Sequence, residues 1–180
     1  TLLVLQQAAR LSPATDVRFA ALLHDLGKGL TPETEWPRHI AHEQRGLALV
    51  RRVCERLRAP NQHRDLALQV CEFHLLVHRA KELRGKTLLK LFRATGALRQ
   101  PERFRAFLLA CEADARGRRG MEERDYPQAA YLQRALTLAQ SVTAAPFVAR
   151  GISGKALGDA IAAEQTRLLD AFRAAHKDEV

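Results

Sequence analysis

The sequence predicts an all-α protein, a compact helical bundle that continues into a helical tail. Three observations support this class. No segment combines the apolar–polar alternation of a strand with β-branched or aromatic residues between turn signals. Apolar residues recur instead at spacings of three and four over several long stretches. Proline and glycine separate these stretches and leave mostly short connections, as a helical bundle requires.

Each expected helix ends where the sequence interrupts helical backbone. The interruptions are Ser12-Pro13, the loop from Gly27 to Pro37, Ala59-Pro60, Gly85, Gln100-Pro101, Gly117 to Pro127, and Gly151 to Gly154. We therefore expect helices over residues 1–11, 16–25, 42–58, 61–80, 86–95, 101–115, 127–144 and 154–175.

Two of these helices differ in how apolar residues are distributed around the helix. The helix over 42–58 has one apolar stripe, with charged residues opposite, and is expected at the surface. Its stripe is Leu47, Val50, Val53, Cys54 and Leu57. The helix over 61–80 has two apolar stripes, one of which includes Leu75, and only a narrow polar face. We expect it to be central, and it carries His74 and His78.

At 180 residues the chain has the length of one domain, or of one domain with a helical extension. Alanine replaces aromatic residues after Pro127, so we expect a domain over 1–122 and a tail over 123–180. Helical periodicity begins at Thr1 without a capping residue, which suggests a fragment cut inside a helix. The domain is thus expected to be truncated at its N-terminus.

The three cysteines, Cys54, Cys71 and Cys111, lie far apart inside amphipathic stretches. This spacing predicts reduced core residues rather than a disulfide framework. The sequence has no apolar run as long as a membrane span and no signal-peptide pattern. We therefore expect a soluble, cytoplasmic protein.

The chain is strongly basic, with a formal net charge of +9 from 29 Lys+Arg against 20 Asp+Glu. Such a charge favours association with polyanions such as nucleic acid through the release of counterions. A merely solvated basic surface explains the same composition, so both interpretations stay open.

Residues 22–42, LLHDLGKGLTPETEWPRHIAH, concentrate side chains of the kind that bind metals. The adjacent His24 and Asp25 offer an imidazole nitrogen and carboxylate oxygens, a set suited to divalent Mn, Ni, Co, Fe, Zn or Mg. A histidine at a helix end is more often a structural hydrogen-bonding residue. Lys28, one turn later, favours the metal interpretation because a phosphate substrate needs a cation there.

Four further histidines extend this pattern. His39 and His42 lie at the expected start of a helix, where exposed amides and the helix dipole favour anions. His74 and His78 are four residues apart and share one helix face, so they could chelate a metal. Two buried histidines with backbone hydrogen bonds are an equally good explanation of that pair.

Five segments carry a resemblance to a known family: HDLGKGLTP, WPRHIAHEQRG, CEFHLLVH, CEADARGRRG and DYPQ. The first resembles the histidine–aspartate doublet of the HD-domain phosphohydrolases. The ordered series resembles the C-terminal HD region of the bacterial CCA-adding enzymes, which are tRNA nucleotidyltransferases. The likeness covers nearly the whole chain and is strongest from Val17 to about Gln128.

The resemblance implies an HD-type helical bundle with a divalent metal (Mg, Mn, Ni or Co) and phosphohydrolase activity. The activities implied are 2',3'-cyclic phosphodiesterase, 2'-nucleotidase and phosphatase, with nucleotide 2',3'-cyclic phosphates or 2'-phosphates as substrates. The tail is expected to contact tRNA. In this family, CCA addition and its nucleotide substrates need a nucleotidyltransferase head that is not among these residues.

The chain departs from the family pattern at two metal ligands. The family has a histidine just upstream of the position of Thr1, and an aspartate where this chain has Leu75. Two protein ligands hold a catalytic metal poorly. Either His42, His39 or His74 completes the site, or the hydrolase activity is lost and the domain remains as a scaffold that binds tRNA.

If the site works, we expect the following roles. His24, Asp25, His42 and His74 are the expected metal ligands, and Asp25, Lys28 and His39 the expected catalytic residues. Lys28, Arg38, Arg116 and Arg118 are expected to bind substrate phosphate. Asp114 also matches the family, but an acid among arginines at a helix end is more often part of a structural ion pair and cap.

Three functional hypotheses remain. The first is the HD and tail portion of a tRNA nucleotidyltransferase, with a site that hydrolyses phosphoesters. The second is a catalytically silent tRNA-binding module, and the third is an independent HD hydrolase that acts on nucleotides. We expect no membrane partner, and the sequence allows a homodimer.

Overall fold

A computed structural model of the chain describes residues 1–176, and this part is all-α, without a strand. The fold class expected from the sequence is therefore confirmed. The α-helices are α1 (Leu2–Leu11), α2 (Thr15–Leu23), α3 (His42–Arg56), α4 (Asn61–His78), α5 (Gly85–Ala94), α6 (Pro101–Arg116), α7 (Pro127–Gln140), α8 (Ala145–Val148) and α9 (Gly154–Ala175). Short 3₁₀-helices are η1 (Leu26–Leu30), η2 (Glu33–Glu35) and η3 (Ala80–Glu82).

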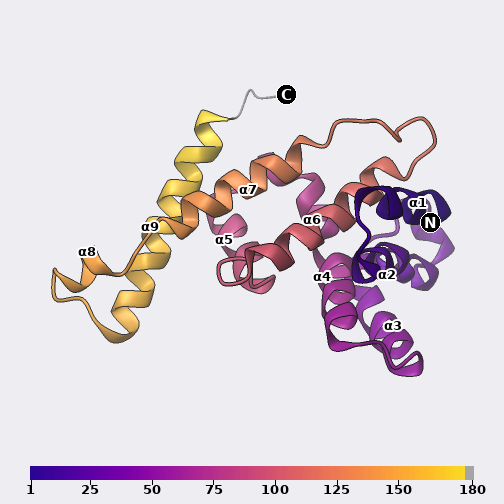
Figure 1. Cartoon of the computed structure of the whole chain (residues 1–180), viewed down its shortest axis with the longest axis horizontal. Helices are drawn as coiled ribbons and strands as arrows, with labels where there is room; N and C mark the ends of the chain where they lie inside the picture. The colour runs from indigo at the N-terminus through magenta and orange to yellow at the C-terminus, as the bar shows by residue number, and fades with distance from the viewer. Residues whose placement is uncertain (177–180) are drawn as a thin grey trace.

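The molecule is elongated, with α1 to α4 grouped at one end and α8 and α9 at the other (Figure 1). Helix α6 packs against α1, α2 and α4, whereas α9 packs against α5 and α7. Helix α4 also contacts α2 and α3. It is therefore the central helix of the N-terminal group, as its two apolar stripes predict.

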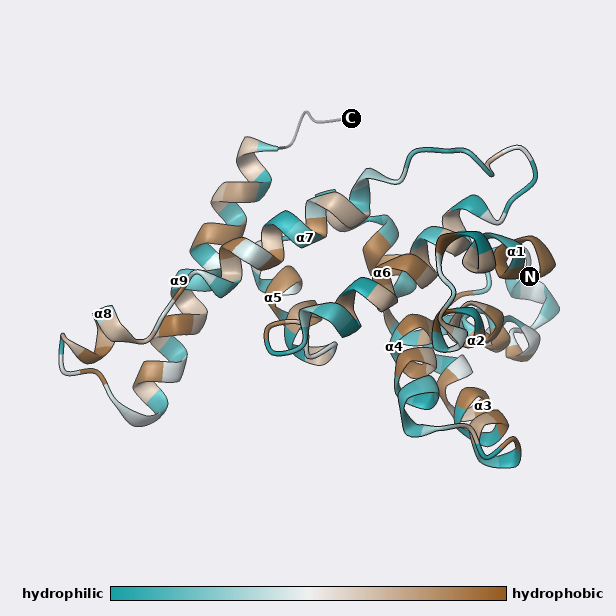
Figure 2. Cartoon of the chain, in the orientation of Figure 1, coloured by the Kyte–Doolittle hydropathy of each residue, from teal (hydrophilic) through white to brown (hydrophobic). Residues whose placement is uncertain are grey.

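The core joins the two ends through aromatic side chains. Phe92 of α5 and Phe104 of α6 pack edge to face, with ring centroids 5.5 Å apart, and Phe107 stacks on Phe104. All three are buried. Apolar residues lie mainly on the inward sides of the helices (Figure 2), as packed amphipathic helices require. The three cysteines are free and buried, which confirms their expected place in the core.

The expected helices are all present, but five of them, α2, α3, α4, α5 and α7, end one to four residues earlier than predicted. The helix expected over 16–25 ends at Leu23, and the helix expected over 127–144 ends at Gln140, followed by the separate turn α8. The expected loop from Gly27 to Pro37 contains η1 and η2. Leu57, expected on the apolar stripe of α3, lies beyond its last residue and is 58% exposed.

Gly27 brings η1 into direct contact with α3. A Cβ atom at position 27 would lie 1.8 Å from the backbone oxygen of His42 and 2.7 Å from the backbone nitrogen of Gly46. Gly46 is similarly crowded, because its Cβ would lie 2.7 Å from Sγ of Cys71 on α4. Helices α3 and α4 and the segment after α2 therefore meet at two positions that accept no side chain.

We expect Gly27→Ala to lower the free energy of unfolding by about 3 kcal/mol, because backbone atoms, unlike a flexible side chain, cannot move aside. The measurement is chemical denaturation followed by circular dichroism. Gly29→Ala is the matched control: a Cβ there meets nothing within 4 Å, so the change is expected to stay within about 0.5 kcal/mol. Equal stability of the two variants would contradict the prediction.

Candidate metal centre

Residues from five elements converge where α2 ends. His24 is the C-terminal cap of α2, Asp25 precedes η1, and His42 is the first residue of α3. His74 comes from the middle of α4 and Asp114 from the last turn of α6. They form two groups that could hold a metal ion, Asp25–His42–His74 and His24–Asp25–Asp114. Asp25 belongs to both groups.

The same kind of hydrogen bond orients the imidazole rings of His24, His42 and His74. Each Nδ1–H donates to a backbone carbonyl oxygen: His24 to Ala21 (2.7 Å), His42 to His39 (2.9 Å) and His74 to Val70 (2.9 Å). Each ring is also nearly buried. Such bonds fix the tautomer, so each neutral ring presents the lone pair of Nε2, as in protein metal sites.

The Nε2 atoms face Asp25 and one another. Nε2 of His42 lies 3.1 Å from Oδ1 of Asp25 and 3.4 Å from Nε2 of His74. Nε2 of His24 lies 3.1 Å from an oxygen of Asp25 and 3.1 Å from an oxygen of Asp114. Even so, Nε2 of His24 and Oδ1 of Asp25 have no well-directed hydrogen bond in the described part of the chain.

The electrostatics of the cluster keep His74 neutral and both carboxylates ionised, whereas His24 stays protonated in the metal-free chain. Burial and the neighbouring His24 lower the pKa of His74 to about 4, so this ring is neutral at neutral pH. Burial opposes ionisation of Asp25 and Asp114, but the nearby ring of His24, through its short Nε2 contacts and its positive charge, holds both pKa values well below the usual range. Burial likewise lowers the pKa of His24, yet Asp114 and Asp25 outweigh it and raise this pKa to about 9.

Asp114 is held in place by a second histidine. Nε2–H of His78 donates to Oδ2 of Asp114 (2.8 Å), so Nδ1 of His78 is an acceptor, and the hydroxyl of Tyr126 donates to it (2.9 Å). Oδ1 of Asp114 is thereby directed to His24. His78, which the sequence allowed either as a metal ligand with His74 or as a structural histidine, is bonded to a carboxylate that faces the cluster.

These residues fit a divalent cation. The cluster combines imidazole nitrogens and carboxylate oxygens, the donor set of divalent transition metals. Lone pairs of His42 and His74 point at each other whenever both rings are neutral, and two buried polar atoms lack hydrogen-bond partners. A cation among these atoms would satisfy them, since buried polar groups without partners are costly.

The structure brings together His24, Asp25, His42 and His74, all four of the metal ligands expected from the sequence. Lys28 lies beside them, because its ammonium forms an ion pair with Asp25. Leu75, which stands where the family has an aspartate, is 39% exposed.

Other expected site residues lie elsewhere. Nδ1 of His39 is hydrogen-bonded to the hydroxyl of Thr31 (2.6 Å). The backbone carbonyl oxygen of His39 accepts the hydrogen bond from Nδ1–H of His42. Arg38 and Arg118 are exposed, and Arg116 pairs with Glu112 (3.0 Å). Sequence reasoning underrated Asp114 and missed Tyr126, although both lie in segments that carried the family resemblance.

Residues 1–125 match the sequence model of the family described as "HD domain". The chain therefore belongs to the HD-domain family. Its segment from α1 to α6 supplies the histidine–aspartate doublet and the buried cluster around it.

Nearly the whole chain is similar to proteins named "Multifunctional CCA protein". It is 54% identical to the one from Alkalilimnicola ehrlichii over 173 residues, which are 96% of this chain and 42% of that protein. It is 53% identical to the one from Nitrosococcus oceani over 178 residues (99% and 43%), and 55% identical to the one from Teredinibacter turnerae over 160 residues (89% and 39%). The chain thus spans about two fifths of the length of these relatives, and the resemblance seen in its motifs is confirmed. No solved structure matches it.

We expect His42→Ala and His74→Ala each to weaken the binding of Mn²⁺, Co²⁺ or Ni²⁺ by about 100-fold or more, because each removes a candidate ligand. Isothermal titration calorimetry of the chelator-treated chain measures this. His63→Ala is the matched control, since His63 lies outside the cluster and faces Thr15 at 3.0 Å. A loss of the same size in the control would argue against the cluster.

Metal affinity is expected to rise with pH. Metal and proton compete for Nε2 of His24, which stays protonated up to a pKa of about 9 in the metal-free chain. Affinity should therefore increase by up to about tenfold per pH unit between pH 7 and 9 and level off above. The protonated ring stabilises the metal-free fold fully below pH 6.5, and this contribution is lost as the pH rises through 9. Calorimetry in two buffers of different protonation enthalpy measures how many protons are released when the metal binds. A metal affinity that does not change with pH would refute the assignment of the released proton to His24.

Proposed function

We propose that the chain is the HD-domain and tail portion of a tRNA nucleotidyltransferase and that its cluster is a metal-dependent phosphohydrolase centre. One observation supports the phosphohydrolase centre above all. The imidazole rings of the cluster are held by hydrogen bonds from Nδ1 to backbone carbonyl oxygens, and their Nε2 atoms face the carboxylate of Asp25. About 50% identity over nearly the whole chain to multifunctional CCA proteins supports the first part. CCA addition itself is assigned to the remaining length of such a protein.

His24, Asp25, His42, His74 and Asp114 would hold the metal. When bound, a divalent cation supplies Lewis-acid polarisation of a phosphoryl oxygen and an activated water nucleophile. The three imidazoles favour Mn, Co, Ni, Fe or Zn over Mg, which prefers oxygen ligands.

Lys28 is the residue best placed to receive the substrate phosphate. Its ammonium pairs with Asp25 at the edge of the cluster, and its side chain is 40% exposed. It can therefore offset the charge of a phosphate that approaches Asp25 from solvent. His39 remains the proposed proton donor to the leaving oxygen; its Nδ1 bond to Thr31 fixes the ring but does not bring it into the cluster.

The start of the chain lies against the helix that carries Asp114. A Cβ at Gly117 would lie 2.4 Å from Cγ2 of Val4, so the first turn of α1 lies directly against the end of α6. Asp114 is in the last turn of the same helix.

The test is hydrolysis of a nucleoside 2',3'-cyclic phosphate by the chain with added Mn²⁺, Co²⁺ or Ni²⁺, with and without the residues upstream of Thr1. Asp25→Asn should lower turnover by at least about 10³-fold, because Asp25 contacts both groups of candidate ligands. The matched control is Asp65→Asn, since Asp65 pairs with Arg64 and Arg103 outside the cluster. Metal binding without turnover in either form would favour the silent tRNA-binding module.

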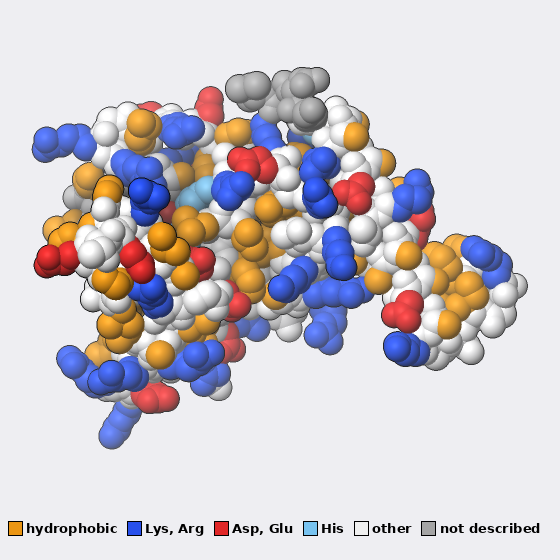
Figure 3. Space-filling model, turned by 180° about the vertical axis from the view of Figure 1, so that it is seen from behind, with side chains coloured by type: hydrophobic (Ala, Val, Ile, Leu, Met, Phe, Trp, Pro, Cys, Tyr) orange, Lys and Arg blue, Asp and Glu red, His pale blue; other side chains and the backbone are white. Residues whose placement is uncertain are grey.

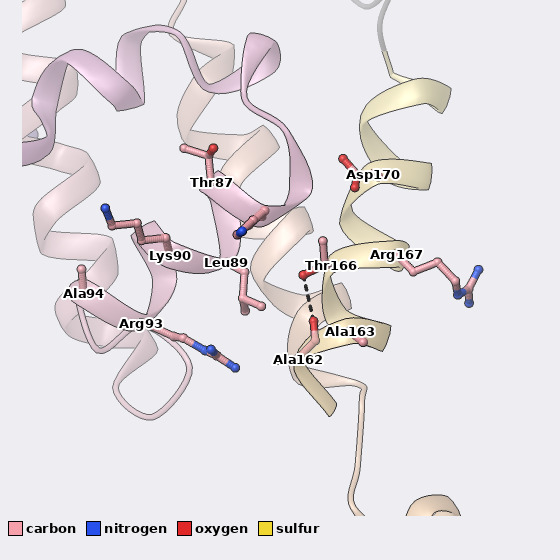
Figure 4. A pocket seen from close by; sticks show the side chains of 11 residues that line it. Thr87, Leu89, Lys90, Arg93, Ala94, Ala162, Ala163, Thr166, Arg167 and Asp170 are labelled. Atoms are coloured by element: carbon pink, nitrogen blue, oxygen red, sulfur yellow. Dashed lines mark hydrogen bonds between the residues drawn. The ribbon is translucent and has the colours of Figure 1, made fainter. Parts of the chain in front are cut away.

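The second candidate function, tRNA binding by the tail, is favoured by a groove of about 1070 Å³ between α5 and α9 (Figure 4). Its rim carries the cations Lys86, Lys90 and Arg93, the carboxylate of Asp170, and Arg167, which is paired with Glu164. Arg93 extends from α5 toward α9 and Lys90 extends away from it, and both side chains are exposed. Basic side chains along a groove suit the phosphate backbone of an RNA helix.

We expect the double variant Lys90→Gln/Arg93→Gln to weaken tRNA binding about tenfold and to reduce the salt dependence by one to two released ions, as about two lost phosphate contacts should. Fluorescence anisotropy at several salt concentrations measures both. Arg51→Gln/Arg52→Gln on the exposed face of α3 is the charge-matched control. Equal losses in both variants would indicate attraction by net charge alone.

A further inference from the structure

A second cavity of about 1070 Å³ lies beside Asp114, on the side of the segment that leads into α7. His78 and Tyr126, which hold Asp114 in place, both line it. Figure 3, from the face opposite to that of Figure 1, shows a histidine exposed among Lys and Arg side chains. The cavity is therefore next to the candidate metal centre but is lined by other residues.

The lining of this cavity suits an anion. Lys81 from η3, Arg118 and Arg124 contribute three cations, whereas Asp125 contributes one carboxylate. Helix α7 begins at Pro127, on the wall of the cavity, and directs the positive end of its dipole there. The guanidinium groups can each form two parallel hydrogen bonds to a phosphate.

The cavity is too large for phosphate alone and offers apolar contacts beside the cations. A volume near 1000 Å³ is typical of a site for a small organic ligand. The ring of Tyr126 and the thioether of Met121 lie on its wall. Aromatic and thioether groups are surfaces on which a nucleobase can stack.

We propose that this cavity binds a nucleotide beside the metal centre, with a phosphate other than the one that is hydrolysed on Arg118 and Arg124 and with its base against Tyr126 and Met121. The proposal deepens the phosphohydrolase function and rests on it for the identity of the reaction. In this position a single residue, His78, lies between the nucleotide and Asp114, and His78 is hydrogen-bonded to Asp114.

Occupancy of the cavity also bears on the metal centre. A ligand against Tyr126 contacts the residue whose hydroxyl donates to Nδ1 of His78, and His78 in turn fixes Oδ2 of Asp114. His78 and Tyr126 are thus positioning residues. Tyr126→Phe removes the donated hydrogen bond and should weaken metal binding several-fold without removing a ligand.

The test is calorimetric titration of adenosine 5'-monophosphate, and separately of inorganic phosphate, into the chelator-treated chain. Arg118→Gln and Arg124→Gln should each weaken nucleotide binding about tenfold, because both side chains are exposed lining residues. Arg119→Gln is the matched control, an exposed arginine next in sequence that does not line the cavity. Nucleotide binding unchanged in Arg118→Gln and Arg124→Gln, or an equal loss in Arg119→Gln, would overturn the proposal.

Two further measurements separate this inference from the proposed function and identify the source of the nucleotide. Metal titration of Arg118→Gln and Arg124→Gln should match the unsubstituted chain, since neither residue is a candidate ligand. A chain that binds the nucleotide through these arginines but binds no metal would overturn the proposed function and leave the cavity assignment intact. Tighter binding of a short oligoribonucleotide with a terminal 2'-phosphate would identify an RNA end as the source, and equal affinity a free nucleotide; both support the cavity.

Discussion

The contact between Gly27 and the first turn of α3 is the constraint on which the site depends. No side chain fits at position 27, because a Cβ atom would overlap the backbone oxygen of His42. This closeness sets the segment after α2 against α3 and brings Asp25 within 3.1 Å of His42. At Gly46, α3 packs equally closely against α4, the helix that carries His74. Two glycines thus determine the distances among residues of three elements.

Short-range backbone bonds then give the cluster its chemistry. His24 and His74 donate to carbonyl oxygens of their own helices, and His42 donates to the carbonyl of His39. His39 and Ala41 have positive φ angles of 49° and 53°, an unfavourable backbone conformation for residues other than glycine. The strain coincides with the turn that delivers His42, as is common where a functional site is held by its surroundings.

The cluster is connected to the rest of the molecule through α6. Asp114 receives a hydrogen bond from His78, which receives one from Tyr126, the residue before α7. Helix α7 in turn packs against α9. The segment between α6 and α7 is therefore a wall of the second cavity and also part of the support of Asp114. A boundary between domain and tail near residue 122, which stays a prediction, would fall within this connection.

The sequence by itself determined the fold class, nearly all helix positions and the doublet at His24 and Asp25. These properties follow from local periodicity and from interruptions by proline and glycine, which act within a few residues. It also named His42 and His74 as candidate ligands, with His42 as the most plausible third ligand and His39 as a further possibility. Only the tertiary structure shows that the rings of His42 and His74 face Asp25 whereas Nδ1 of His39 is bonded to Thr31, because ring orientation depends on which group each Nδ1 reaches. The same holds for Asp114: its two oxygens are assigned by contacts with His24 and His78, which are far away in the sequence.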